Sequence, residues 1–69
     1  MHIGQQIEKI FREQGRKVSW FADKLCCDRR NVYKIFERES IDTALLVRIS
    51  IVLDHDFLKD LSDKLKENK

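Results

Sequence analysis

The residues that break helices are nearly absent from this chain, and this constrains its fold more than any other feature. The 69 residues include no proline and only two glycines, Gly4 and Gly15. Apolar residues recur at three- and four-residue steps, the spacing that places them on one face of a helix. The sequence therefore predicts an all-α fold, a compact bundle of about five short helices in one domain over residues 1–69. A chain this short must use every apolar helix face to build its core.

Residues 18–37 contain two apolar segments separated by a short polar break. The apolar positions are Phe21, Ala22 and Leu25 in the first segment and Val32, Ile35 and Phe36 in the second. Their helical spacing predicts two short helices that pack against each other across a tight turn. The small side chain of Ala22 allows the two backbones to approach closely. Asp28 is expected to begin the second helix, with its carboxylate accepting a hydrogen bond from a first-turn amide.

The face of the second helix that the core does not need carries polar and cationic side chains. They are Arg29, Arg30, Asn31, Tyr33 and Lys34. Arg can bond guanine with two hydrogen bonds and Asn can do so with adenine, while Lys and Tyr suit phosphates and groove edges. Residues 9–38 hold nine Lys or Arg against four Asp or Glu, and residues 39–69 hold five against seven. The basic part coincides with this helix, although a solvated, positively charged face without a ligand is the simpler alternative.

On these residues the chain resembles the Cro and phage-repressor type of helix-turn-helix protein, the XRE family, over residues 3 to about 58. The matching positions are Ala22, the small residue Cys26 after the first helix, and the capping residue Asp28. The resemblance implies a λ repressor-like fold and a sequence-specific transcription regulator whose helix at about 29–37 enters the major groove of double-stranded DNA. The chain differs from the family at Val18, where Gln is frequent, and at Cys26, where Gly is favoured.

The resemblance also assigns contacts residue by residue. It implies base contacts from Arg29, Arg30, Asn31 and Lys34. It implies phosphate contacts from Ser19, Tyr33, Arg38, Ser40 and Thr43. For Ser40 and Thr43, helix capping is the alternative, because Ser40 or Asp42 is expected to cap a helix that runs to about Leu53. A different class of function also stays open, a helical protein-interaction module of adaptor or antitoxin-like type that docks on an acidic partner without specific DNA reading.

The C-terminal part carries more apolar side chains than one small core needs. On the helix that ends near Leu53, Leu45, Ile49 and Val52 are expected to fill the core, which leaves Val47 and Ile51 on the other side. After a turn at 54–56, a last helix carries an apolar stripe. The stripe consists of Phe57, Leu58, Leu61 and Leu65. It either covers the preceding helix within one chain or pairs with a second chain, and the family resemblance favours a homodimer through residues 47–65.

Other classes of protein have little support. No segment reaches the length of a membrane span and no signal peptide is evident, which predicts a cytoplasmic protein without a membrane partner. The adjacent Cys26 and Cys27 form neither a disulfide framework nor a zinc site, so Cys27 is expected to fill an apolar turn position and a redox role is the alternative. His55 is expected to be a turn residue. No spacing points to a catalytic pair, so we expect neither enzymatic activity nor a cofactor or metal.

Overall fold

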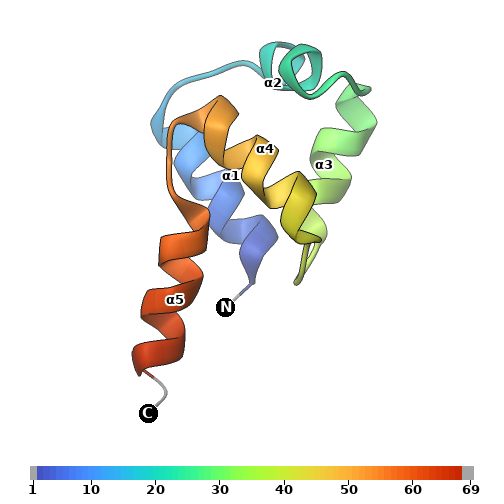
Figure 1. Cartoon of the computed structure of the whole chain (residues 1–69). Coiled ribbons are helices and arrows are strands. Elements are labelled where there is room, and N and C mark those ends of the chain that lie inside the picture. The colour runs from blue at the N-terminus through green and yellow to red at the C-terminus, as the bar shows by residue number, and fades with distance from the viewer. Residues whose placement is uncertain (1, 68–69) are drawn as a thin grey trace.

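A computed structural model describes residues 2–67 and confirms the all-α prediction. Within these residues there are five helices and no strands (Figure 1). They are α1 (Ile3–Glu13), α2 (Val18–Leu25), α3 (Arg29–Glu37), α4 (Thr43–Leu53) and α5 (Phe57–Glu67). The molecule is elongated, 39 Å by 19 Å by 18 Å, because α5 extends away from the group formed by the other four helices (Figure 1).

The aromatic part of the core lies where α1, α2 and α3 meet, and buried residues of α4 and Phe57 of α5 complete the core. The rings of Phe11 and Phe21 stack with their centroids 5.2 Å apart, and the Phe36 ring lies 5.5 Å from Phe11. The inner face of α3 is buried as the periodicity predicted, and Ala22 is buried where α2 approaches α3. Trp20 packs at the rim of this core, where the guanidinium of Arg16 lies 4.5 Å from the centre of its ring. Stacking of this kind is an ordinary surface contact for Arg.

Backbone hydrogen bonds join the start of α1 to the residues that directly follow α3. The amide of Ile3 donates to the Glu39 carbonyl (3.2 Å), and that of Gly4 donates to the Arg38 carbonyl (2.9 Å). A Cβ atom on Gly4 would come within 2.5 Å of the carbonyl oxygens of Ile35 and Phe36. A side chain at position 4 would therefore force the two helices apart. Gly4 permits this approach, whereas Gly15 serves as the left-handed residue after α1, with φ of 68°.

The helix α4 faces the core with a different set of residues from the predicted one. Leu46, Ile49 and Leu53 are buried, while Leu45 and Val52 are only half-buried. The prediction of Leu45, Ile49 and Val52 was thus correct only at Ile49. Because α4 is apolar nearly all round, its sequence lacks the polar and apolar contrast that sets the rotation of a helix about its axis. The predicted end at Leu53 is confirmed, and of the two caps that the sequence allowed, Ser40 and Asp42, it is Asp42 that accepts from the Leu45 amide (3.1 Å).

Two three-residue turns in the chain share one backbone conformation. The turn between α2 and α3 contains Cys26 with φ 56° and ψ 45°, and the turn between α4 and α5 contains Asp54 with φ 51° and ψ 46°. In both, the left-handed residue donates to the carbonyl three residues back. The next residue donates to the carbonyl five residues back, Cys27 to Ala22 and His55 to Ser50, each at 3.0 Å. Both helices thus end in a Schellman motif.

The residues that begin the next helix differ in their capping. Asp56 accepts a hydrogen bond from the Lys59 amide (2.9 Å), as a capping aspartate does. Asp28 occupies the corresponding position before α3, with an extended backbone, but its side chain accepts no such bond. The expectation that the Asp28 carboxylate caps the second helix was therefore wrong. The carboxylate is exposed at this position, where water competes for it, and only its charge next to the helix start remains favourable.

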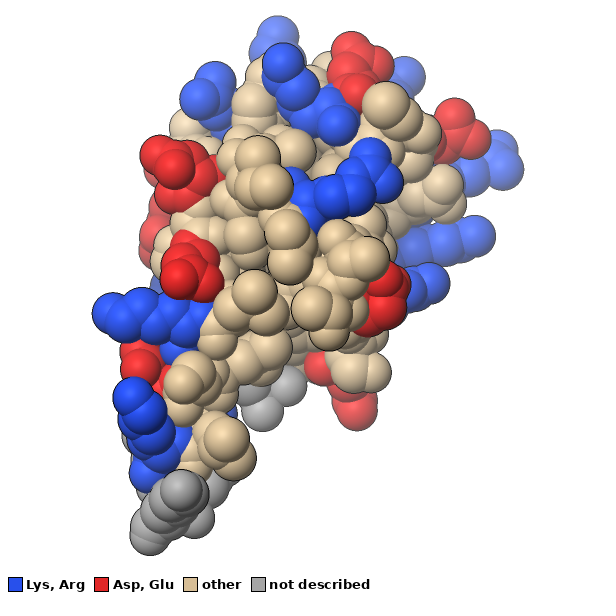
Figure 2. All heavy atoms as spheres, viewed as in Figure 1, with Lys and Arg blue, Asp and Glu red and all other residues tan. Residues whose placement is uncertain are grey.

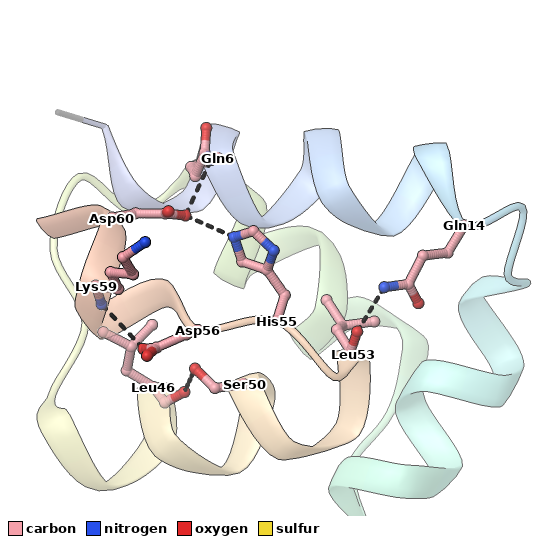
Figure 3. Close-up of polar contacts among 9 residues, drawn as sticks. All are labelled: Gln6, Gln14, Leu46, Ser50, Leu53, His55, Asp56, Lys59 and Asp60. Atoms are coloured by element: carbon pink, nitrogen blue, oxygen red, sulfur yellow. Dashed lines mark hydrogen bonds and ion pairs between the residues drawn. The ribbon is translucent and has the colours of Figure 1, made fainter. Parts of the chain in front are cut away.

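Polar contacts hold the first turn of α5 against the rest of the molecule. One oxygen of Asp60 accepts from the side-chain amide of Gln6 in α1 (3.1 Å) and lies 2.7 Å from Nε2 of His55 (Figure 3). His55 is confirmed as a turn residue, and its ring also lies 4.6 Å from that of the buried Phe57. The side chain of Gln14, at the other end of α1, donates to the Leu53 carbonyl. These contacts fix only the start of α5.

None of the helices in residues 2–67 combines the length and the hydropathy that crossing a membrane requires.

Candidate nucleic-acid interface

The helix α3 has one buried and one exposed face, and the chemistry of the two faces is different. Val32, Ile35 and Phe36 are buried in the core. All four residues nominated for base contacts are exposed: Arg29, Arg30, Asn31 and Lys34. Their donors, and the acceptor oxygen of Asn31, are therefore available on a rigid element whose position is fixed by α1 and α2. A rigid helix that carries such groups outward can hydrogen-bond an extended polar ligand.

Asn31 and Lys34 belong to a groove between α3 and α4. This α3–α4 groove has a volume of about 320 Å³. Its polar lining consists of Asn31, Lys34, Arg38 and Arg48. Its apolar lining consists of Leu25, Cys27, Ile35 and Leu45. The groove therefore combines cationic donors with an apolar floor, and none of its lining residues is acidic.

Arg48 is a member of this groove that the sequence interpretation did not nominate. It projects from the middle of α4, and its Nη2 donates to the carbonyl of Leu25 at the end of α2 (3.0 Å). The partial negative charge at a helix C-terminus favours a cation there. The two residues are 23 positions apart. Only the packing of α2 against α4 brings them together, so no local pattern in the sequence marks Arg48 as part of the site.

The remaining residues of α3 lie in two other places. Arg29 and Arg30 are the first two residues of the helix and do not line the groove. Tyr33 is about half exposed and lines a separate depression beside α1, together with the carboxylates of Glu8 and Glu37. The structure thus separates Tyr33 from Asn31 and Lys34 by placing it on the opposite side of α3. The two carboxylates that line this depression make it less favourable for an anion.

The other residues nominated for phosphate contacts are exposed. Ser19 is the second residue of α2, and Thr43 is the first residue of α4. Ser40 lies in the connection between α3 and α4, directly after the residues whose carbonyls receive the α1 amides. Neither Ser40 nor Thr43 is the residue that caps α4, because Asp42 has that role. Arg38 is the C-cap residue that follows α3, and it lines the groove, so it alone among this set lies beside Asn31 and Lys34.

The two cysteines at the turn before α3 have different surroundings. Cys26 is exposed, and Cys27 is half-buried against the core, in agreement with the packing role predicted for it. Burial raises the pKa of the Cys27 thiol, and the nearby Asp28 carboxylate raises it further, while the Arg48 guanidinium acts in the opposite direction. A raised pKa keeps the thiol protonated at neutral pH, and the protonated form is a poor nucleophile.

Lys and Arg side chains gather at two parts of the surface seen in Figure 2. They project from the edge of the molecule formed by α2 and α3, with a few acidic side chains among them, and they lie along α5 together with acidic side chains. Uncharged atoms cover the middle of the same face, over α4 and beside the start of α5. Four large apolar side chains on these two helices are exposed. We call them the α4–α5 apolar surface: Val47, Ile51, Leu58 and Leu65.

No group of His, Cys, Asp or Glu side chains within residues 2–67 is arranged to hold a metal ion. The sequence matches no known family model and no curated protein, and the structure matches no solved structure. The geometry and chemistry of this chain's own residues are therefore the basis for its functional interpretation.

Proposed function

We propose that this chain is a sequence-specific DNA-binding transcriptional regulator of the Cro and phage-repressor type, with α3 as its recognition helix. The observation that carries the proposal is the division of α3 into two faces. One face is buried in the core, and the other leaves Arg29, Arg30, Asn31 and Lys34 exposed at its start and middle. These are the side chains that bond base edges in the major groove, and a single helix fits the width of that groove.

Binding of a strand beside α3 has further support from the neighbouring cations. Arg38 and Arg48 extend the positive charge of α3 onto α4, and Arg16 and Lys17 precede α2. A protein gains much of its affinity for DNA by neutralising phosphates and releasing the counterions bound to them. In the proposed complex, Arg29, Arg30, Asn31 and Lys34 determine the sequence preference. Phosphate contacts from the α3–α4 connection and from the start of α2 set the position of the protein on the duplex.

The proposed regulator binds as a homodimer through the α4–α5 apolar surface. Ile51 and Leu65 are 74% and 65% exposed, although both are large apolar residues whose burial is favourable. A two-fold axis through this surface would present two copies of α3 to the same side of a duplex. The half-sites would then be centred about 10 base pairs apart, one turn of DNA.

The deciding experiment is selection of binding sites from a random duplex pool by the full chain. The enriched duplex and a scrambled control are then titrated at near-physiological salt. We expect the enriched duplex to bind at least about a thousandfold more tightly than the control, as specific DNA readers do. An enriched palindrome supports the dimer as well, and a single half-site supports the reader but removes the dimer. Equal weak binding of both duplexes contradicts the proposal and favours a module that docks on an acidic protein.

A further inference from the structure

The α3–α4 groove has an architecture that base contacts from α3 do not account for. It is bordered by Lys34, Arg38 and Arg48, and none of its lining residues carries a negative charge. Like charges gathered around a depression repel one another, so an anion inside it would relieve that repulsion. The Asn31 amide adds a neutral donor at the same border. The groove therefore presents hydrogen-bond donors from two helices to one anionic group.

The guanidinium of Arg48 is held at this border in a defined position. Its Nη2 donates to the Leu25 carbonyl, which ties the side chain to the end of α2. A guanidinium carries five N–H donors, so this bond leaves others available for a ligand. Because one hydrogen bond already holds the Arg side chain, the side chain loses less conformational entropy when it binds a phosphate. Arg48 is in this respect a pre-oriented anion ligand.

The size and floor of the groove indicate which kind of anion it fits. A volume of about 320 Å³ is near the lower limit of sites for small organic ligands and exceeds what an inorganic ion needs. The floor is apolar, with Leu25, Ile35 and Leu45. A sugar-phosphate unit matches both features, because its phosphate can meet the cations while its deoxyribose covers the apolar floor.

We propose that the α3–α4 groove binds one phosphodiester unit of the DNA backbone, with Arg48 and Arg38 as its phosphate ligands. This inference rests on the proposed function, because Asn31 and Lys34 belong both to the groove and to the face of α3 that meets the bases. A strand that follows α3 through these two residues enters the groove directly. The contact fixes how deeply α3 is inserted, and it favours no base sequence.

The test compares the salt dependence of DNA binding between Arg48→Gln and a matched control, Lys59→Gln. Both variants remove one positive charge, but Lys59 is an exposed residue of α5 that lines no part of the groove. We expect Arg48→Gln to bind the selected and the scrambled duplex about three- to tenfold more weakly, with the slope of log K against log salt reduced by about 1. Lys59→Gln should keep the wild-type slope, and Arg48→Lys, which retains the charge, should restore most of it.

Thermal unfolding of each variant checks that Arg48→Gln has not simply lost its fold along with its bond to Leu25. Amide chemical shifts of Leu25, Ile35 and Leu45 then identify the ligand, with the scrambled duplex and inorganic phosphate as the two probes. Shifts with the duplex that Arg48→Gln abolishes support the inference. Shifts with inorganic phosphate alone, or a wild-type slope in folded Arg48→Gln, overturn it.

Different results would contradict the proposed function and this inference. If the wild-type chain bound the selected and scrambled duplexes equally, sequence-specific reading would be excluded. A slope reduced by about 1 in Arg48→Gln would then still place a phosphate in the groove.

Discussion

The turn between α2 and α3 and the turn between α4 and α5 have nearly the same backbone, yet the helices that follow them are packed very differently. Cys26 and Asp54 adopt the same left-handed conformation, with dihedral angles that agree within 5°. After the first turn, α3 lies between α1 and α2 with its apolar face buried. After the second, α5 extends away from the bundle (Figure 1). The conformation of a turn between two helices therefore does not by itself determine how the second helix packs.

The difference arises from the number of partners that each second helix has. Both α3 and α5 carry an apolar stripe, but α3 packs against two helices, whereas α5 packs chiefly against α4. In the stripe of α5, Phe57 is fully buried and Leu61 is half-buried, whereas Leu58 and Leu65 are exposed. The outer face of α3 is cationic, and the exposed part of α5 mixes apolar and charged residues. In our proposal, α3 binds DNA and α5 binds a second protein chain. The surface side chains and the neighbouring helices of α3 and α5, rather than the turns, are the basis of this assignment.

The largest expected effect is the difference in unfolding free energy between substitutions at the two ends of α5. Phe57→Ala should lower the free energy of unfolding by about 3–5 kcal/mol, because it removes a fully buried ring and leaves a cavity. Leu65→Ala should change it by no more than about 0.5 kcal/mol in dilute protein, since the side chain is exposed. Urea unfolding followed by circular dichroism measures both. A large effect of Leu65→Ala that grows with protein concentration would support the dimer, and a small effect of Phe57→Ala would contradict the burial described above.

A second prediction concerns the packing that distinguishes α3 from α5. Gly4→Ala should destabilise the protein by about 1–3 kcal/mol, because its methyl group would overlap the carbonyls at the end of α3. Gly15→Ala meets no neighbouring atoms, and its cost of about 1 kcal/mol comes only from the left-handed backbone. Both variants add one methyl group, but only Gly4→Ala meets the end of α3, so its loss in unfolding free energy reports the contact of α1 with α3. A Gly4→Ala protein as stable as the wild type would contradict this contact.

The outer face of α3 is tested by loss of discrimination rather than by loss of affinity. Asn31→Ala should reduce the preference for one base position of the selected site by about 1–3 kcal/mol if the amide bonds an adenine. Lys34→Ala distinguishes a base contact from a phosphate contact, because a phosphate contact weakens all duplexes alike. Titration of a set of single-base variants of the site measures both effects. A uniform loss for Asn31→Ala across the set would contradict its proposed role.

The smallest expected effect compares the two turns directly. Replacing either left-handed residue with Gly, as Cys26→Gly or Asp54→Gly, should stabilise the protein by up to about 1 kcal/mol. The gain should be larger at Cys26, because Asp tolerates the left-handed region better than Cys does. Both residues are exposed, so little packing is lost. A loss of stability in either variant, measured by thermal unfolding, would show that the side chain contributes more than its backbone conformation costs.

The buried face of a helix could be predicted from sequence only where polar and apolar residues occupy different sides of that helix. In α3, cationic and apolar residues alternate with helical period, and the predicted inner face was correct at every position. In α4 the apolar residues surround the axis, so the predicted face was correct only at Ile49. The end of α4 was still predicted, and its start was narrowed to a cap at Ser40 or Asp42, since capping residues and a polar turn are local signals.

Contacts between distant residues account for what the sequence did not indicate. Gly4 was recognised as a helix breaker, but its function is to admit the carbonyls of Ile35, Phe36 and Arg38, more than thirty positions away. Arg48 joins the candidate site through a carbonyl of α2, and Tyr33 is turned toward α1 by the rotation of α3. The exposed residues of α3 could be predicted from the helical period alone, because the positions that are not apolar must lie on the surface of the helix.

The two backbone bonds between the start of α1 and the end of α3 also make the first turn of α1 a reporter of tertiary structure. Amides in the first turn of a helix have no partner within it and ordinarily exchange their protons with water rapidly. Those of Ile3 and Gly4 are instead bonded to the carbonyls of Glu39 and Arg38. Their exchange with deuterium therefore requires α1 to separate from α3. Protection of these two amides from exchange therefore measures, in solution, how firmly the C-terminal end of the candidate recognition helix is held.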